Sequence, residues 1–126
     1  MTTSADCGMR NAELLKERTK RFAIAVIKLI EELPKNRMAD VLGTQLLRSG
    51  TSVGANYRAA CRARSRADFV SKMGIVEEEA DETQYWIELL IEAKLVDQRR
   101  VQHLLEESDA IIAMTVSSIR TARSNK

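Results

Sequence analysis

The stretch of residues 45–59 has the periodicity of a helix but an unusual composition for one. Polar residues at spacings of four, three and four share one face, where a helix normally buries leucines: Gln45, Ser49, Ser52 and Asn56. Arg48 lies beside this face, and Gly50 and Gly54 form a second row of small residues. Such a helix is expected to pack very closely on its neighbours and to bury hydrogen-bonded polar groups.

Three further segments show the apolar periodicity of amphipathic helices. The first is expected from about Asn11 to Leu33, because Pro34 cannot continue a helix. The expected N-caps of the other helices are Asn36, Ser65 and Asp97. Because the connections are short, neighbouring helices must run antiparallel. The sequence therefore predicts an all-α fold, an antiparallel up-down-up-down four-helix bundle over residues 11–123, preceded by a flexible N-terminus over residues 1–10.

The composition agrees with this fold and argues against several others. The chain has 126 residues, 44% hydrophobic and 30% charged, as expected for one folded domain. One proline and five glycines are too few for the turns of an all-β protein. No apolar run reaches the length of a membrane span, and the first residues lack the apolar core of a signal peptide. We therefore expect a cytoplasmic protein with no membrane partner, in which Cys7 and a half-buried Cys61 are reduced.

Two patterns suggest enzymes but lack the residues that the chemistry needs. Residues 50–54, GTSVG, have the form G-x-S-x-G of a hydrolase nucleophile elbow, which requires a strand, a turn and a helix. Here the motif lies inside a predicted helix, and the single histidine, His103, belongs to another helix. The acidic cluster at 77–82 resembles a di-metal bundle, but such a site needs two E-x-x-H motifs. We therefore expect no catalytic residues, no metal and no cofactor.

The acidic cluster has a better structural use. If the second and third helices pack antiparallel, Arg48 can form an ion pair with Glu79 or Glu82, next to Trp86. Together with the polar face described above, this predicts a structural polar network of Gln45, Arg48, Ser49, Ser52, Asn56, Glu79 and Glu82. A solvated acidic face is the alternative that the sequence leaves open.

Basic residues concentrate in the first part of the chain. Residues 1–72 carry a formal net charge of +7, and residues 73–126 carry −5. The candidate nucleic-acid-binding residues form two clusters, namely Arg58, Arg62, Arg64 and Arg66, and Lys16, Lys20 and Arg21. Such side chains contact phosphates without reading bases, and with five aromatic residues in the chain base stacking has little support. The alternatives are helix-end charge compensation and neutralisation between the two halves of the fold.

A resemblance extends over most of the chain, from about residue 14 to residue 120. The stretches that carry it read LLKERTKRFAIAVIKLIEELPKN and QLLRSGTSVGANYRAACRARSRADFVSKMGIVEEEADETQYWIELL. Within them the matching positions are Gln45, Arg48, Ser49, Ser52, Val53, Asn56, Phe69, Lys72, Glu79, Glu82 and Trp86. They resemble the four-helix-bundle family of 23S rRNA intervening-sequence proteins.

The resemblance implies a small antiparallel bundle that assembles into a ring, commonly a homopentamer. A related group, the accessory proteins of diversity-generating retroelements, binds nucleic acid and a reverse transcriptase, whereas most members have no established biochemical activity. The leading expectation is thus a non-enzymatic homo-oligomer whose basic surface binds RNA or DNA. The alternative is a protein-interaction scaffold or accessory subunit without nucleic-acid binding. Apolar residues outside the inward-facing rows of the helices are the expected subunit contacts: Ala23, Ile24, Ile27, Ile91, Leu95 and Met114.

Overall fold

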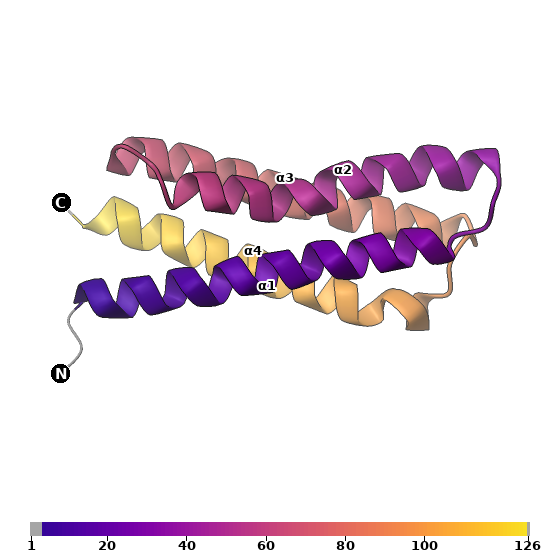
Figure 1. The fold of residues 1–126 in the computed structure, drawn as a ribbon, viewed down its shortest axis with the longest axis horizontal. Helices are drawn as coiled ribbons and strands as arrows, with labels where there is room; N and C mark the ends of the chain where they lie inside the picture. The colour runs from indigo at the N-terminus through magenta and orange to yellow at the C-terminus, as the bar shows by residue number, and fades with distance from the viewer. Residues whose placement is uncertain (1–3, 126) are drawn as a thin grey trace.

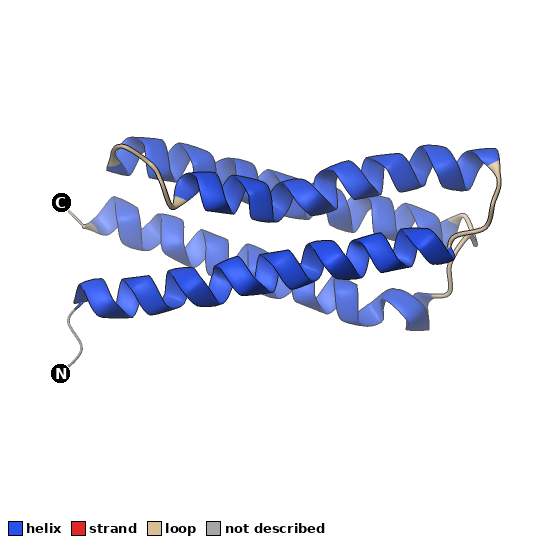
Figure 2. Cartoon of the chain, in the orientation of Figure 1, coloured by secondary structure: helices blue, strands red, loops and turns tan. Residues whose placement is uncertain are grey.

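The protein forms four long helices joined by short connections (Figures 1 and 2). The computed structural model describes the backbone of residues 4–125 and the side chains of residues 12–125. The helices are α1 (Ser4–Glu32), α2 (Arg37–Ala60), α3 (Arg66–Glu92) and α4 (Gln98–Ser124). No strand occurs over residues 4–125, so the all-α prediction is confirmed.

Successive helices run in opposite directions, and each packs on two others around one core. Figure 1 shows both chain ends at the same end of the bundle, while the α1–α2 and α3–α4 connections lie at the opposite end. Helix α1 packs on α2 and α4, and α3 packs on the same two helices. The predicted up-down-up-down bundle is therefore the observed architecture.

Local signals in the sequence set the helix starts. The side chains of Asn36, Ser65 and Asp97 each accept a backbone N–H bond from the first turn, at 2.9, 3.0 and 2.8 Å respectively. The Asp68 carboxylate, three residues after Ser65, accepts the backbone N–H of Arg64 at 3.1 Å. All three predicted N-caps are confirmed, since each supplies an acceptor that the helix start lacks.

One helix boundary differs from the prediction, and another has a specific backbone cause. Helix α1 begins at Ser4 rather than near Asn11, so residues 4–10 of the expected N-terminal segment continue the helix, and residues 1–3 lie outside the described residues. Helix α3 ends where Lys94 adopts a left-handed backbone with φ of 62°. This conformation lets the Leu95 N–H bond to the Leu90 carbonyl at 2.9 Å and close the helix end.

The core is a continuous apolar column built from the predicted stripes. Its largest fully buried side chains are Phe22, Leu29, Leu46, Met73, Ile87, Leu90, Leu104 and Ile111. Each such residue contributes about 1.5–3 kcal/mol through removal of its apolar surface from water. Four stripe residues, Ile30, Phe69, Leu105 and Ile112, are half-buried and pack on the edge of the column. Over residues 4–125, no helix combines the length and apolar character that a bilayer crossing requires.

Small residues bring α2 into close contact with α1. A Cβ placed on Gly50 would lie 2.9 Å from both methyl carbons of Val26, and one on Gly54 would lie 3.2 Å from Thr19 Oγ1. A Cβ on Gly43 would likewise lie 3.2 Å from Leu33 Cδ1. The sequence predicts close packing at Gly50 and Gly54 without deciding between a contact inside the subunit and one across an interface, and the structure shows contact with α1 of the same subunit.

Candidate nucleic-acid interface

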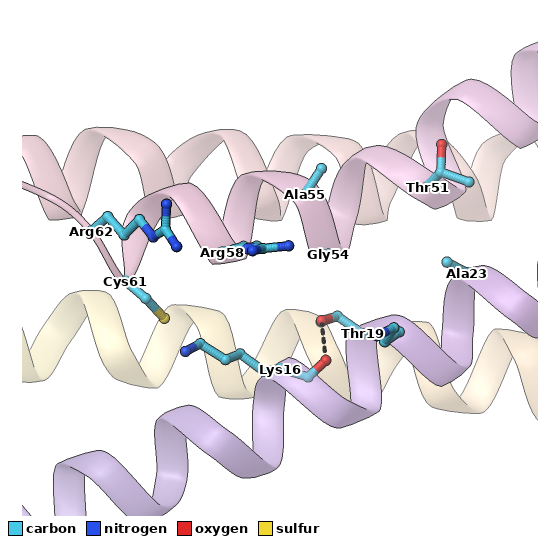
Figure 3. Close-up of a pocket in the computed structure, with 10 residues that line it drawn as sticks. Lys16, Thr19, Ala23, Thr51, Gly54, Ala55, Arg58, Cys61 and Arg62 are labelled. Carbon is cyan, nitrogen blue, oxygen red and sulfur yellow. Dashed lines mark hydrogen bonds between the residues drawn. The ribbon is translucent and has the colours of Figure 1, made fainter.

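A hollow of about 480 Å³ opens along the α1–α2 seam, next to Gly54 (Figure 3). Four of the seven predicted nucleic-acid-binding residues line it: Lys16, Lys20, Arg58 and Arg62. The remaining lining is small or neutral and consists of Thr19, Ala23, Thr51, Gly54, Ala55 and Cys61. We call this hollow the basic groove. It unites two clusters that lie more than 35 residues apart in the sequence.

The helices arrange the four cations in two short rows. Lys16 and Lys20 are one turn apart on α1, a repeat of about 6 Å along that helix. Arg58 lies in the last turn of α2, and Arg62 lies in the turn that follows the end of α2 at Ala60. Gly54 lies one turn before Arg58 and packs against Thr19 of α1, so no side chain of α2 fills this part of the seam. Figure 3 shows Lys16 and Arg58 extending into the space between the two helices, with Arg62 at its end.

The groove carries a concentrated positive charge. No carboxylate lines it, and among the described side chains Lys20, Arg58 and Arg62 have no acidic partner within 4 Å. Lys16 lies 3.3 Å from Glu13, which is one turn earlier on the exposed side of α1. Because this pair is solvent-exposed, it holds Lys16 weakly. The groove can therefore bind an anion without first breaking a strong ion pair.

The other three predicted residues do not join the groove. Arg21 donates to Glu17 at 2.7 Å on the surface of α1. Arg64 lies in the α2–α3 connection and Arg66 begins α3, and neither lines the hollow. The two basic clusters predicted from the sequence therefore contribute four residues to one groove, while Arg21 lies elsewhere on the surface of α1 and Arg64 and Arg66 lie beyond the end of α2.

Cys61 lies at the mouth of the groove and is exposed rather than half-buried, because α2 ends at the preceding residue. The nearby Tyr57 is almost fully buried, and this burial raises the pKa of its hydroxyl. Tyr57 therefore supports the end of α2 as a core residue.

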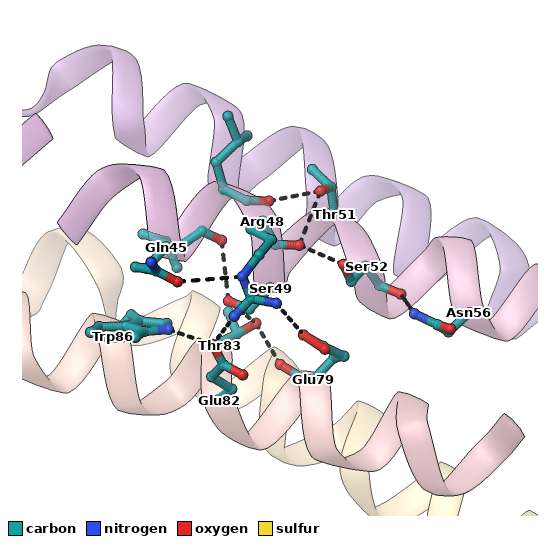
Figure 4. Close-up of polar contacts among 12 residues, drawn as sticks. Gln45, Arg48, Ser49, Thr51, Ser52, Asn56, Glu79, Glu82, Thr83 and Trp86 are labelled. Atoms are coloured by element: carbon teal, nitrogen blue, oxygen red, sulfur yellow. Dashed lines mark hydrogen bonds and ion pairs between the residues drawn. The ribbon is translucent and has the colours of Figure 1, made fainter. Parts of the chain in front are cut away.

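The predicted polar network lies on the other side of α2 (Figure 4). Arg48 donates to Glu79 at 3.2 Å and also to Glu82, and Glu82 in turn accepts the indole N–H of Trp86 at 2.9 Å. Gln45 Oε1 lies 3.3 Å from Arg48 Nε. The predicted ion pair is therefore present with both candidate carboxylates. It is a surface feature, however, because the Arg48 side chain is 47% exposed.

Burial of the polar face is confirmed at one position and wrong at others. Ser49 is fully buried, and its hydroxyl lies 3.0 Å from the hydroxyl of Thr83 on α3. Ser52 and Asn56 are half-buried and donate to backbone carbonyl groups one turn earlier in their own helix, at 2.7 and 2.8 Å. Neither connects α2 to α3, because the local carbonyls satisfy their donors first.

Polar contacts with α4 were not predicted from the sequence. Arg18, which belongs to the basic cluster of α1, donates to both carboxylate oxygens of Glu107 at 2.9 and 2.7 Å. Arg100 pairs in the same bidentate way with Glu32, at 2.6 and 2.7 Å. Hydrogen bonding from Arg100 lowers the pKa of Glu32, and hydrogen bonding to Glu107 raises the pKa of Arg18. The partners in each pair are far apart in the sequence, so the pairs become evident only when the alignment of α1 against α4 is known.

The enzyme-like patterns occupy ordinary helical positions. The G-x-S-x-G residues lie inside α2, where the Ser52 hydroxyl donates to the Arg48 carbonyl instead of standing on a strained turn. His103 is exposed on α4. Within the described residues, no group of three or more His, Cys, Asp or Glu side chains is arranged to hold a metal ion.

Comparison with known proteins agrees with this architecture. A model of the 23S rRNA-intervening sequence protein family matches residues 14–117. Among solved structures, the chain is similar to a protein of unknown function from the S23 ribosomal protein family of Bacteroides thetaiotaomicron. That match has 36% sequence identity and a TM-score of 0.82, and it covers 87% of this chain and 98% of the other. No curated protein matches the chain. The chain therefore belongs to the 23S rRNA-intervening sequence protein family.

Proposed function

We propose that this protein is a non-enzymatic, homo-oligomeric helical bundle that acts in the cytoplasm and binds RNA or DNA through the basic groove. The observation that carries the proposal is the meeting of Lys16, Lys20, Arg58 and Arg62 around one hollow without a carboxylate in its lining. Clustered lysine and arginine side chains attract phosphates and release the counterions that surround nucleic acid. The family name, which refers to 23S rRNA, makes RNA the first probe to test.

Self-assembly is the second part of the proposal, with a ring of five subunits as the specific expectation. Several large apolar side chains are exposed on the single subunit: Leu14, Ile24, Ile27, Met38, Val41, Leu47, Ile75 and Tyr85. Ile24 and Ile27 are among the predicted subunit contacts, and their exposure supports that role. Ile91, Leu95 and Met114 are half-buried against the subunit's own core, so they are weaker candidates. A ring would present several basic grooves to one nucleic-acid chain and strengthen weak single contacts.

Fluorescence anisotropy with labelled RNA and DNA tests the binding at low and moderate salt. We expect salt-weakened binding that R58A/R62A reduces strongly, since this variant removes one complete row of cations. The matched control is R37A/R99A, which removes the same charge from the helix starts at the opposite end of the bundle. Equal losses in the two variants would contradict a localised site and would leave only general attraction to a basic protein.

A protein-interaction scaffold is the second candidate function, and the exposed apolar side chains favour it. It predicts self-assembly without nucleic-acid binding. Light scattering at micromolar concentration tests self-assembly separately from binding. A monomer that binds RNA would support the groove as a binding site and contradict the ring. An oligomer that binds neither RNA nor DNA at low salt would instead support the scaffold.

A further inference from the structure

The basic groove has the shape of a channel with a row of cations on each wall. We infer that it holds the sugar–phosphate backbone of a single strand, in preference to a duplex and without regard to base sequence. This inference rests on the proposed function, because it specifies which form of nucleic acid the same groove accepts. Three features of the described residues support it: the spacing of the cations, the concave shape and the chemistry of the lining.

The spacing fits consecutive phosphates of one strand. On α1 the two lysines are separated by one helical turn, about 6 Å along the axis, which is close to the repeat of phosphates along an extended strand. Across the seam, Arg58 lies on the antiparallel helix α2, one turn after Gly54, and Arg62 lies just beyond the end of α2. A strand lying along the seam would therefore place one phosphate near Lys16 or Lys20 and near Arg58 or Arg62 at each step.

The concave shape favours a flexible chain over a rigid one. A volume of about 480 Å³ suits a ligand segment of one or two nucleotides, within the range of ordinary ligand sites. A single strand can bend into such a hollow and bury its phosphates between two rows of cations. A duplex holds its phosphates on the outside of a stiff cylinder. It could touch only the side chains at the rim, and fewer cations would contact each strand.

The lining offers little that distinguishes one base from another. It contains no aromatic side chain to stack on a base and no amide or carboxylate side chain to bond a base edge, which leaves Arg58, Arg62 and the two lysines as its side-chain contacts. The hydroxyl of Thr19 donates to the Lys16 carbonyl at 3.1 Å, and the hydroxyl of Thr51 donates to the Leu47 carbonyl at 2.7 Å. The side-chain donors directed to a ligand are therefore the ammonium and guanidinium groups. Their natural partners are phosphate oxygens, so the bases would face away from the protein.

A direct test compares a labelled 20-nucleotide single strand with a duplex of the same length, by anisotropy at several salt concentrations. We expect the single strand to bind about tenfold more tightly, and two unrelated sequences to bind equally. R58A/R62A should remove this preference and make the salt slope shallower by about 0.7 for each lost phosphate contact, whereas R37A/R99A should preserve both. Circular dichroism checks that each variant stays helical.

The possible failures are distinguishable. A duplex that binds as tightly as the single strand, with both weakened by R58A/R62A, would overturn the strand preference and leave the nucleic-acid site standing. Strong dependence on base sequence would likewise overturn the inference, because the inference assigns the cations of the groove to phosphates. Absence of binding to either form would remove the proposed function together with the inference. If R58A/R62A and the wild-type protein bound equally, the groove would not be the site.

Discussion

Helix α2 meets its two neighbours through seams of opposite chemistry. Along the α1–α2 seam, glycines replace side chains, and Val26 and Thr19 pack almost directly on the α2 backbone. Along the α2–α3 seam, hydrogen-bonding side chains make the contact, with a buried Ser49–Thr83 pair beneath a surface cluster around Arg48. One seam is held by shape, and the other by polar pairing.

The difference has a consequence for charge. At the polar seam, Arg48 forms ion pairs with two carboxylates of the same subunit, those of Glu79 and Glu82. At the glycine seam, the close approach leaves a hollow beside Gly54, and the cations around it face no carboxylate in the lining. Two cations of the same helix therefore have different roles. Arg48 joins helices within the subunit, whereas Arg58 is available to an external anion, together with Arg62 just beyond the helix end.

The largest expected effect comes from breaking the glycine seam. Val26 is fully buried and β-branched, so it cannot move away from a Cβ at 2.9 Å. G50A should therefore destabilise the protein by about 1–2 kcal/mol in urea unfolding, after the gain in helix propensity is included. Gly74 on α3 has no atom within 4 Å of an added Cβ, so the control G74A should stabilise by about 0.5–1 kcal/mol. Similar shifts in both variants would show that the α1–α2 seam is not tightly packed.

A second substitution probes the polar seam. T83V keeps the shape of the side chain but removes the hydroxyl that lies 3.0 Å from Ser49 Oγ and 2.8 Å from the Glu79 carbonyl. The Ser49 hydroxyl keeps its contact with the Leu46 carbonyl at 3.3 Å, so no donor is left without an acceptor. We expect a loss of about 1 kcal/mol in urea unfolding. T115V on α4 is the matched control for a buried hydroxyl that bonds only its own helix, and should cost less. An equal loss in both would deny the contact between helices any special value.

A smaller effect is expected for the surface part of the same seam. A double-mutant cycle with R48A and E82A should give a coupling energy of about 0.5 kcal/mol, reduced at high salt, because the pair is partly exposed. Each single variant also loses other contacts, and the cycle subtracts these losses to leave the coupling energy of the Arg48–Glu82 pair. A coupling near zero would show that the Arg48 cluster is a solvated surface that does not stabilise the fold, so that the buried Ser49–Thr83 contact would be the polar interaction that stabilises the seam.

The smallest effect is expected at the α1–α4 seam, which serves as a reference for the two seams of α2. Hydrogen bonding from Arg100 lowers the pKa of Glu32 in the folded protein. The pair therefore adds stability above the unfolded-state pKa, about 4.3, and this contribution is lost as the pH falls through the lower folded-state pKa. The urea midpoint of E32Q should change less between pH 7 and pH 3 than that of the wild-type protein. A steeper change in E32Q would contradict the pairing.

Local signals in the sequence were sufficient to predict the fold. Asn36, Ser65 and Asp97 each mark a helix start because the side chain supplies one acceptor for the first turn, and Pro34 marks the end of the first helix. These signals are local, so the helices can be placed without knowledge of the tertiary contacts. The observed start of α1 at Ser4 precedes the predicted start near Asn11, because residues 4–10 lack an apolar stripe and the sequence therefore predicts a flexible end. Helix α1 extends through them without such a stripe.

The candidate site was predictable only in part. Composition and spacing identify Lys16, Lys20, Arg58 and Arg62 as basic helical residues, but they cannot show that Gly54 lets the two helices meet beside them. The same limit explains why Arg21 was included, although it pairs with Glu17. It also explains why Ser52 and Asn56 were placed in a buried network, since their choice of a local carbonyl is decided by packing.

The two seams give the arginines of α2 different roles, with Arg48 holding helices together and Arg58 facing the basic groove. Binding of R58A and R48A to a labelled single-stranded RNA, followed by anisotropy, compares two exposed arginines of one helix. We expect R58A to weaken binding by roughly fivefold or more, while R48A, whose charge is already paired with Glu79 and Glu82, changes it less than about twofold. Equal weakening by the two substitutions, or a larger loss in R48A, would contradict these different roles.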